Sequence, residues 1–254
     1  MRGGIAVLTT ALLAAAATAG AQGAAPAPAM SQIEFSIACA PPPTLAADPE
    51  KAPRIVGSQD TAPRTVFGGS DLLVLDGGTK AGLQLGQQFF VRRANSFGMY
   101  RFRPAHNRGA KTLGWVHVVA VNEATAIAQI DHTCGDLLAG DYLEPFVAPA
   151  VPATAESTDT SGEPDFAALG HIVNGVEDRT TFGGGDYALI DRGSEQGVTP
   201  GQRFAIYRDL HKGGLPLTSV GEAIVISTSG SVALARITRA RDAVYEGDYV
   251  APRK

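Results

Sequence analysis

After its first 21 residues the sequence has no apolar run near the roughly 20 residues that cross a bilayer, and we expect no transmembrane segment. The formal net charge is only −4, so the whole molecule has no strong attraction to nucleic acid or to an anionic surface. Outside the first segment no window sustains a helical apolar stripe over three turns. These absences disfavour a helical membrane protein and a nucleic-acid-binding protein, and a β-rich protein is expected.

The sequence also has few groups arranged for catalysis or for holding a cofactor. It contains no Gly-x-Ser-x-Gly, no His-Glu-x-x-His and no paired histidines with zinc spacing. Gly197 and Gly201 are followed by Val198 and Gln202, not by the lysine of a phosphate-binding loop. We therefore predict a protein that is not an enzyme, with no cofactor and no metal site.

The aspartates beside these glycines have a structural explanation. Asp186 and Asp191 lie at opposite ends of one predicted strand, so their carboxylates cannot share the coordination shell of a cation. We expect Asp191 and Asp248 to accept hydrogen bonds from turn amides, as Asp next to Gly commonly does. Gly201, which follows Pro200, is expected in the left-handed conformation of a tight turn.

Residues 1–21 predict export. They contain an early Arg2, an apolar run over residues 5–17 and small residues before position 22, which is the pattern of a cleaved secretory signal peptide. The protein is therefore expected to be periplasmic or associated with the cell envelope. In that oxidising space the pair Cys39 and Cys134 favours a disulfide, with two free thiols as the alternative.

Two blocks of the sequence occur twice. Residues 67–93 align without a gap on residues 182–208, and residues 113–145 align on residues 220–252. The identical positions are mainly glycines and aspartates of turns, and a shorter piece, RIVGSQD in the first copy and HIVNGVED in the second, precedes each first block. One module is therefore used twice.

The modules are predicted over residues 54–145 and 171–254. Their apolar runs of four to eight residues, bounded by Gly, Asp, Pro or Asn, indicate strands. With no room for crossover helices, we predict a mainly β protein of two tandem small antiparallel barrel-like modules. Residues 146–170 are rich in Pro, Ala, Ser, Thr and acids and predict a flexible, disordered linker. Residues 22–53 are expected to be extended, and alternating apolar residues over 33–37 suggest an added strand.

The copies differ most in residues 94–112, which carry aromatic and basic side chains and no acid. Such groups stack on sugars or bases and pair with phosphate or carboxylate. The candidate patch for binding a partner protein or an anionic polymer consists of Phe97, Tyr100, Arg101, Phe102, Arg103, Arg108 and Lys111. The alternative is a solvated hairpin whose aromatic rings pack back onto the module.

The line RIVGSQD, D-x4-D-x-G-x3-G-(L/V)-x2-G-Q-x-F-x-(V/I) and a closing (A/E)-G-D-Y resembles a small secreted module of bacterial envelope proteins. It is similar to the C-terminal domain of flagellar assembly protein T and to domains that follow peptidoglycan-binding LysM domains. The resemblance covers both copies. It implies a non-catalytic β domain, and no catalytic residues are carried over.

Together these features predict a non-enzymatic scaffold or adaptor of the cell envelope that binds a protein partner or a cell-wall polymer. A module that binds a soluble ligand or a polysaccharide is the alternative, and an enzyme ranks third. A deep polar pocket with converging titratable groups would favour the last two, whereas filled barrels with exposed hairpin arms would favour the first.

Overall fold

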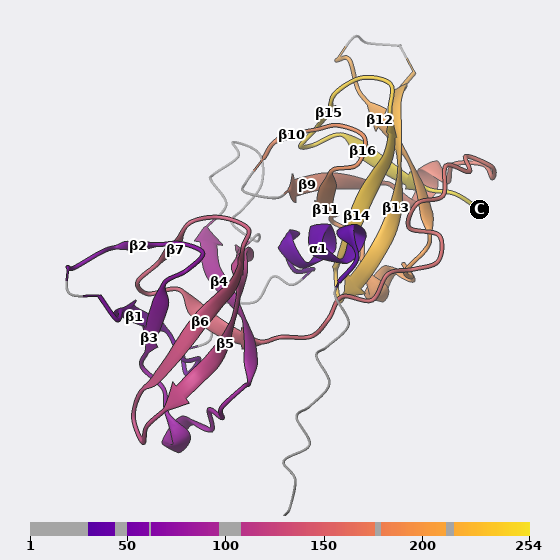
Figure 1. Ribbon diagram of the computed structural model, residues 1–254. Coiled ribbons are helices and arrows are strands. Elements are labelled where there is room, and N and C mark those ends of the chain that lie inside the picture. The colour runs from indigo at the N-terminus through magenta and orange to yellow at the C-terminus, as the bar shows by residue number, and fades with distance from the viewer. Residues whose placement is uncertain (1–29, 44–49, 61, 97–107, 176–178, 212–215) are drawn as a thin grey trace, which may run out of the picture. The chain divides into compact units, whose positions relative to one another are not determined.

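The computed structural model describes residues 30–43, 50–60, 62–96, 108–175, 179–211 and 216–254, and Figure 1 labels its elements. The protein is mainly β, with antiparallel strands in two modules, as the sequence predicts. The predicted signal peptide lies outside the described residues. Across the described ranges, no helix combines the length and the apolar character needed to cross a membrane.

The first module is a six-stranded antiparallel sheet in the order β1-β3-β6-β5-β4-β8. Its strands are β1 (Ile55–Ser58), β3 (Leu72–Leu75), β4 (Gln88–Ser96), β5 (Arg108–Val121), β6 (Ala126–Thr133) and β8 (Tyr142–Pro145), and β2 (Val66–Phe67) pairs separately with β7 (Leu137–Leu138). Alternate residues of β6, namely Ala126, Ala128 and Ile130, are buried in the core, as the two-residue period of a strand requires.

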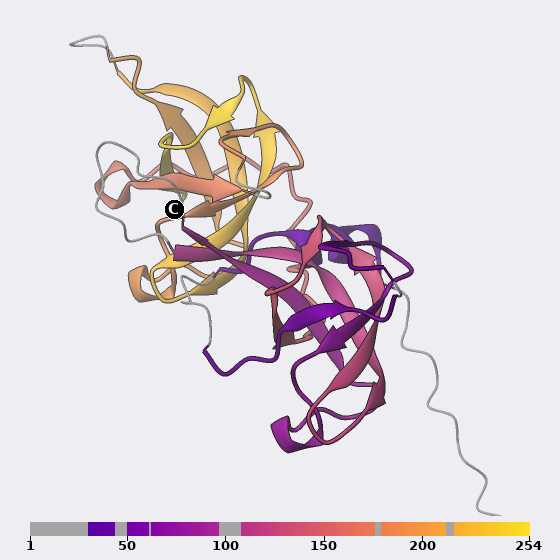
Figure 2. The same cartoon turned by 90° about the vertical axis from the view of Figure 1, so that its left-hand side faces the viewer.

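The second module repeats this strand order and closes into a barrel, β11-β14-β13-β12-β16-β9. Its strands are β9 (Gly170–Gly175), β11 (Tyr187–Ile190), β12 (Arg203–Arg208), β13 (Thr218–Ser229), β14 (Val232–Ala240) and β16 (Tyr249–Pro252), and β10 (Thr181–Phe182) pairs with β15 (Val244–Tyr245). Figures 1 and 2 show these strands curving round one another, in salmon, orange and yellow. The repeat in the sequence is therefore a repeat of the fold.

One proline accounts for a difference in closure between the modules. In the second module β16 pairs with β9, and one of the pairs joins Val250 to Gly170. In the first module Arg54, which directly precedes β1, forms one isolated bridge with Tyr142 of β8. Pro53 occupies the position that Gly170 holds in the other copy. Pro53 accepts a hydrogen bond from the Leu143 N–H at 2.8 Å, but it has no N–H to donate in return.

The repeated aspartates and glycines form turns and hold strands together. Gly201 has a φ of 87°, which confirms the left-handed turn position. The Asp248 carboxylate accepts a hydrogen bond from the Tyr245 N–H at 2.8 Å, as expected for a turn. The Asp191 carboxylate also accepts from a backbone amide, but that amide belongs to His171 in β9, across the sheet. These positions repeat because the fold requires them.

The predicted added strand at residues 33–37 is wrong, because these residues lie in a helix, α1 (Gln32–Cys39). Ser31 and Glu34 form a reciprocal capping box at its start, which satisfies two backbone amides that the helix leaves open. Ile33 and Ile37 are four residues apart, so a helix places them on the same side. Both pack against buried side chains of the second module.

Residues 146–170 do not behave as the predicted free linker, because several of them are fixed on the second module. Ala155 is only 1% exposed, and its carbonyl accepts a hydrogen bond from Arg236 at 3.2 Å. Ser161 accepts one from Arg203 at 3.0 Å, and a short 3-10 turn, η2 (Phe166–Ala168), follows. Small Ala side chains lose no rotamer entropy on burial, so this segment needs few large apolar groups to pack.

Candidate binding groove

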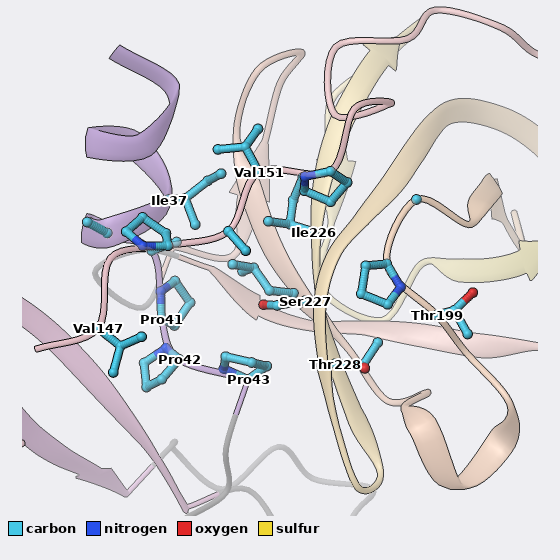
Figure 3. Close-up of a pocket in the computed structure, with 18 of the residues that line it drawn as sticks. Ile37, Pro41, Pro42, Pro43, Val147, Val151, Thr199, Ile226, Ser227 and Thr228 are labelled. Carbon is cyan, nitrogen blue, oxygen red and sulfur yellow. The ribbon is translucent and has the colours of Figure 1, made fainter. Parts of the chain in front are cut away.

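A groove with a volume of about 1020 Å³ lies between α1, the segment that follows it, the connector after β8 and the second module. Figure 3 shows Pro41–Pro43 and Val147 on one side of it. Ile226, Ser227 and Thr228 of β13 face them, with Thr199 farther along. This volume is at the upper end of the range typical of ligand pockets. We refer to this feature as the groove.

Prolines dominate one wall of the groove. Pro41, Pro42 and Pro43 follow directly after α1, and Pro149 and Pro152 come from the connector. A proline has no backbone N–H, so these residues offer rings and carbonyl groups to an occupant but no amide donors. The wall is apolar, and it cannot pair as a strand with a neighbouring chain in the usual way.

The opposite wall contains an open strand edge. The pairing of β13 with β12 ends at Ile224 with Arg203, and the loop before β12 adds bonds to Val225. The pairing of β13 with β14 continues to Ser229 with Val232. Within the described residues, β13 from Ile226 onward therefore has a strand neighbour on one side only. Backbone groups on such an edge can accept an added strand.

Arg92 of β4 is the only charged side chain among the described residues that line the groove. It is 5% exposed, its Nε donates to Glu144 at 3.1 Å, and its Nη1 donates to the Thr112 hydroxyl. The guanidinium lies over the ring of Phe90, 4.3 Å from the centroid, a geometry that is favourable for a cation. Burial lowers the pKa of Arg92 and the Glu144 carboxylate opposes this, so the side chain stays charged.

The predicted disulfide between Cys39 and Cys134 is confirmed, with 5.4 Å between the two Cα atoms. It joins the end of α1 to the first module, next to β6. Trp115 of β5 stacks on His132 of the neighbouring strand β6, and Phe35 of α1 packs against both rings. The bond therefore fixes the point from which Pro41–Pro43 continue into the groove wall.

His132 lies beside the disulfide, and its imidazole is within 4.8 Å of both sulfur atoms. A Cys, Cys and His set can bind a metal ion only through deprotonated thiols. Both sulfur atoms are joined to each other, so in this form the set is a structural bridge.

The candidate patch of the sequence falls largely outside the described residues. This holds for Phe97, Tyr100, Arg101, Phe102 and Arg103. Arg108 and Lys111 belong to β5, where the backbone of Lys111 pairs with Arg93. Lys111 is not among the described residues that line the groove. The binding role of the patch stays a prediction.

Sequence reasoning missed the groove because the two segments that form its proline-rich wall, the one after Cys39 and the connector after β8, were interpreted as an extended segment and a disordered linker. The signals were the proline runs after Cys39 and after Val147, and Arg92, whose counterpart in the second copy is Tyr207. A charged residue at a position that is aromatic in the other copy distinguishes the modules. The relevance of Arg92 to the groove can be recognised only when the structure places α1 and the connector beside β4.

Several carboxylates with lowered pKa values lie in local caps and turns. The pKa of Glu34 is lowered by the Ser31 amide, that of Asp60 by Arg64 and that of Asp159 by the Ser161 amide. None of these carboxylates lines the groove.

No protein-family model matches the chain, and no curated protein matches it either. The argument about function therefore depends on the groove itself.

Proposed function

We propose that the protein is a non-enzymatic, exported adaptor of the cell envelope that binds a partner protein in the groove. The observation that carries this proposal is the make-up of the groove. Its described lining combines aliphatic, proline, hydroxyl and amide groups with one cation, Arg92. An acid–base or nucleophilic mechanism needs convergent titratable groups, whereas recognition needs apolar area and a few polar anchors.

The filled cores of both modules support an adaptor. Leu73 and Leu75 in the first core and Phe204 and Ile206 in the second are at most 1% exposed. Side chains therefore occupy the space that a barrel-type ligand carrier would leave for its cargo. Binding is thus assigned to the outer surface, where the two modules, α1 and the connector all contribute residues to the groove.

Two further features support the envelope as the place of action. The disulfide is of the kind that persists in oxidising compartments. The signal-peptide pattern of residues 1–21 and the resemblance to envelope modules agree with it.

A soluble ligand is the second candidate, and a specific cavity favours it. A pocket of about 480 Å³ lies on the first module, and its lining includes Pro53, Phe89 and Glu144. Its volume suits a small molecule.

Site-specific photo-crosslinking tests the adaptor proposal. A photoreactive amino acid is placed at Thr199, which lines the groove, and in a control at Leu210, which is exposed and does not line it. We expect one partner, identified by mass spectrometry, to be captured from envelope fractions at Thr199 and not at Leu210. A groove-filling Ser227→Trp change should abolish the capture. Equal capture at both positions, or none at Thr199, would contradict the proposal.

A further inference from the structure

The two walls of the groove favour an extended peptide as the occupant. The open edge of β13 over residues 226–228 presents backbone donors and acceptors in the groove, and such an edge recognises a peptide by strand addition. The facing wall, with Pro41–Pro43, cannot fill that role because proline has no N–H. One wall thus offers main-chain hydrogen bonds, and the other offers apolar contact for side chains.

Arg92 adds the requirement that the occupant of the groove carry a negative charge. Its Nε and Nη1 are occupied by Glu144 and Thr112, whereas within the described residues its Nη2 makes no hydrogen bond. Arg92 is 5% exposed as a residue, and a guanidinium with an unused donor in an apolar groove is best satisfied by an anion. Because no other described lining residue is charged, the occupant is expected to carry its negative charge at one place.

We propose that the groove binds the C-terminal segment of a partner protein, as an extended apolar strand whose terminal carboxylate pairs with Nη2 of Arg92. This inference rests on the proposed adaptor function. A chain end suits a recessed cation because no residues have to continue beyond the carboxylate. With an internal Asp or Glu, the peptide chain would continue on both sides of the charged residue, and the groove would need space for both continuations. The groove would also have to accommodate the side chain that carries the carboxylate. The second module has Tyr207 at the corresponding position and so does not repeat the carboxylate site.

The test uses the full chain and short peptides of defined termini. The probe is dye-labelled Pro-Val-Ala-Val with a free C-terminal carboxylate, and the comparison peptide is the same sequence with a C-terminal amide. Fluorescence anisotropy is expected to show about tenfold tighter binding, or more, for the carboxylate form, because the amide keeps a carbonyl acceptor but lacks the negative charge that strengthens the hydrogen bond to the guanidinium. Equal affinities, or no measurable binding of either peptide, would overturn the proposal.

Two further peptides distinguish the sources of a carboxylate. One is an amidated Val-Glu-Val peptide with an internal side-chain carboxylate, and the other ends in D-Ala-D-Ala, as a cell-wall stem peptide does. We expect both to bind more weakly than the probe. Tighter binding of either peptide would overturn the assignment to a protein C-terminus.

Variants locate the interaction. Arg92→Gln is expected to remove the preference for the carboxylate over the amide, whereas Arg239→Gln, at an exposed arginine outside the groove lining, is expected to leave it unchanged. Glu144→Gln keeps Arg92 and removes a competing carboxylate, so it should tighten binding of the probe several-fold. This second variant keeps the test decisive if Arg92→Gln does not fold. A preference that survives Arg92→Gln in a folded chain would contradict the proposal.

The outcomes separate this inference from the adaptor function. Capture of a partner at Thr199 without a carboxylate preference would overturn the chain-end proposal and leave the adaptor function standing. Loss of both the capture and the peptide binding would overturn both.

Discussion

Arg208 donates two hydrogen bonds to Asp248, from Nε at 2.9 Å and from Nη2 at 2.7 Å, one to each carboxylate oxygen. The aspartate is buried, and the same carboxylate also accepts from a turn amide. Arg93 and Asp141 repeat this arrangement in the first module, at 2.7 and 2.8 Å. The pair joins β12 to the loop before β16, and so connects the two blocks of the repeated sequence.

Asp248→Ala is expected to lower the free energy of unfolding by about 3 kcal/mol, because it leaves a partly buried guanidinium and a turn amide without a partner. Asp242 provides a matched control, since it also contacts Arg208, at 3.3 Å, but its side chain is 68% exposed. Asp242→Ala should cost less than about 0.5 kcal/mol. Chemical denaturation of both variants measures the difference, and equal losses would show that the buried pair has no special weight.

Removal of the disulfide is expected to destabilise the fold strongly. Cys39 and Cys134 are 95 residues apart, and the chain-entropy model assigns about 4 to 5 kcal/mol to a loop of that length. The double variant Cys39→Ala, Cys134→Ala should therefore have a lower Tm than the oxidised protein and a Tm that does not change with reductant. The oxidised protein should lose stability when reductant is added. An unchanged Tm on reduction would refute the structural role of the bond.

The repeat made most of the fold predictable. Two aligned copies showed which glycines and aspartates belong to turns, and short bounded apolar runs gave the strands. Cys39 and Cys134 were pairable from their number and the expected compartment alone. The turns and strands depend on local sequence, and the disulfide follows from the number of cysteines. The structure contains all of these features.

The helix α1 was missed because its apolar residues contact both modules, on different sides of the helix. Ile33 and Ile37 pack against the second module, whereas Phe35 lies 5.6 Å from the Trp115 ring in the first. Alternating apolar residues then resemble a strand, although the capping box of Ser31 and Glu34 was readable. The groove was missed for a related reason, because its walls meet only after distant segments have packed.

Gly193 and Gly183 are both repeated glycines, and they test whether close contact with backbone atoms is what makes a glycine necessary at Gly193. A Cβ at this position would overlap the carbonyl oxygens of Ser229 and Gly230, which are backbone atoms and cannot easily move. Gly193→Ala is expected to cost about 1–3 kcal/mol of stability through overpacking. At Gly183 the nearest atom to an added Cβ is 3.9 Å away, in the Asp186 side chain, so Gly183→Ala should change stability by less than about 0.5 kcal/mol. Thermal unfolding of both variants measures the two losses of stability. Similar losses would contradict the prediction that Gly193→Ala is the more destabilising change.

The pH dependence of stability offers a test at Glu246. Partial burial raises the pKa of its carboxyl group, so the charged form is less favourable in the folded state than in the unfolded chain. The resulting stabilisation is complete below the unfolded-state pKa and is lost as the pH rises through the higher folded-state pKa. Glu246→Gln should therefore stabilise the protein at neutral pH, by about 0.5 kcal/mol, and the gain should disappear in acid below about pH 4.

Asp165 provides the control of opposite sign. Its pKa is lowered by hydrogen bonds from the Lys254 ammonium and the Ala167 amide, so it stabilises the fold above its unfolded-state pKa and loses this effect as the pH falls through the folded-state value. Asp165→Asn should therefore destabilise the protein at neutral pH, with the difference from the unmodified protein shrinking in acid. Denaturant unfolding of both variants across this pH range is the measurement. If the two stability differences have the same sign at neutral pH, burial of the Glu246 carboxyl group is not the cause of its effect.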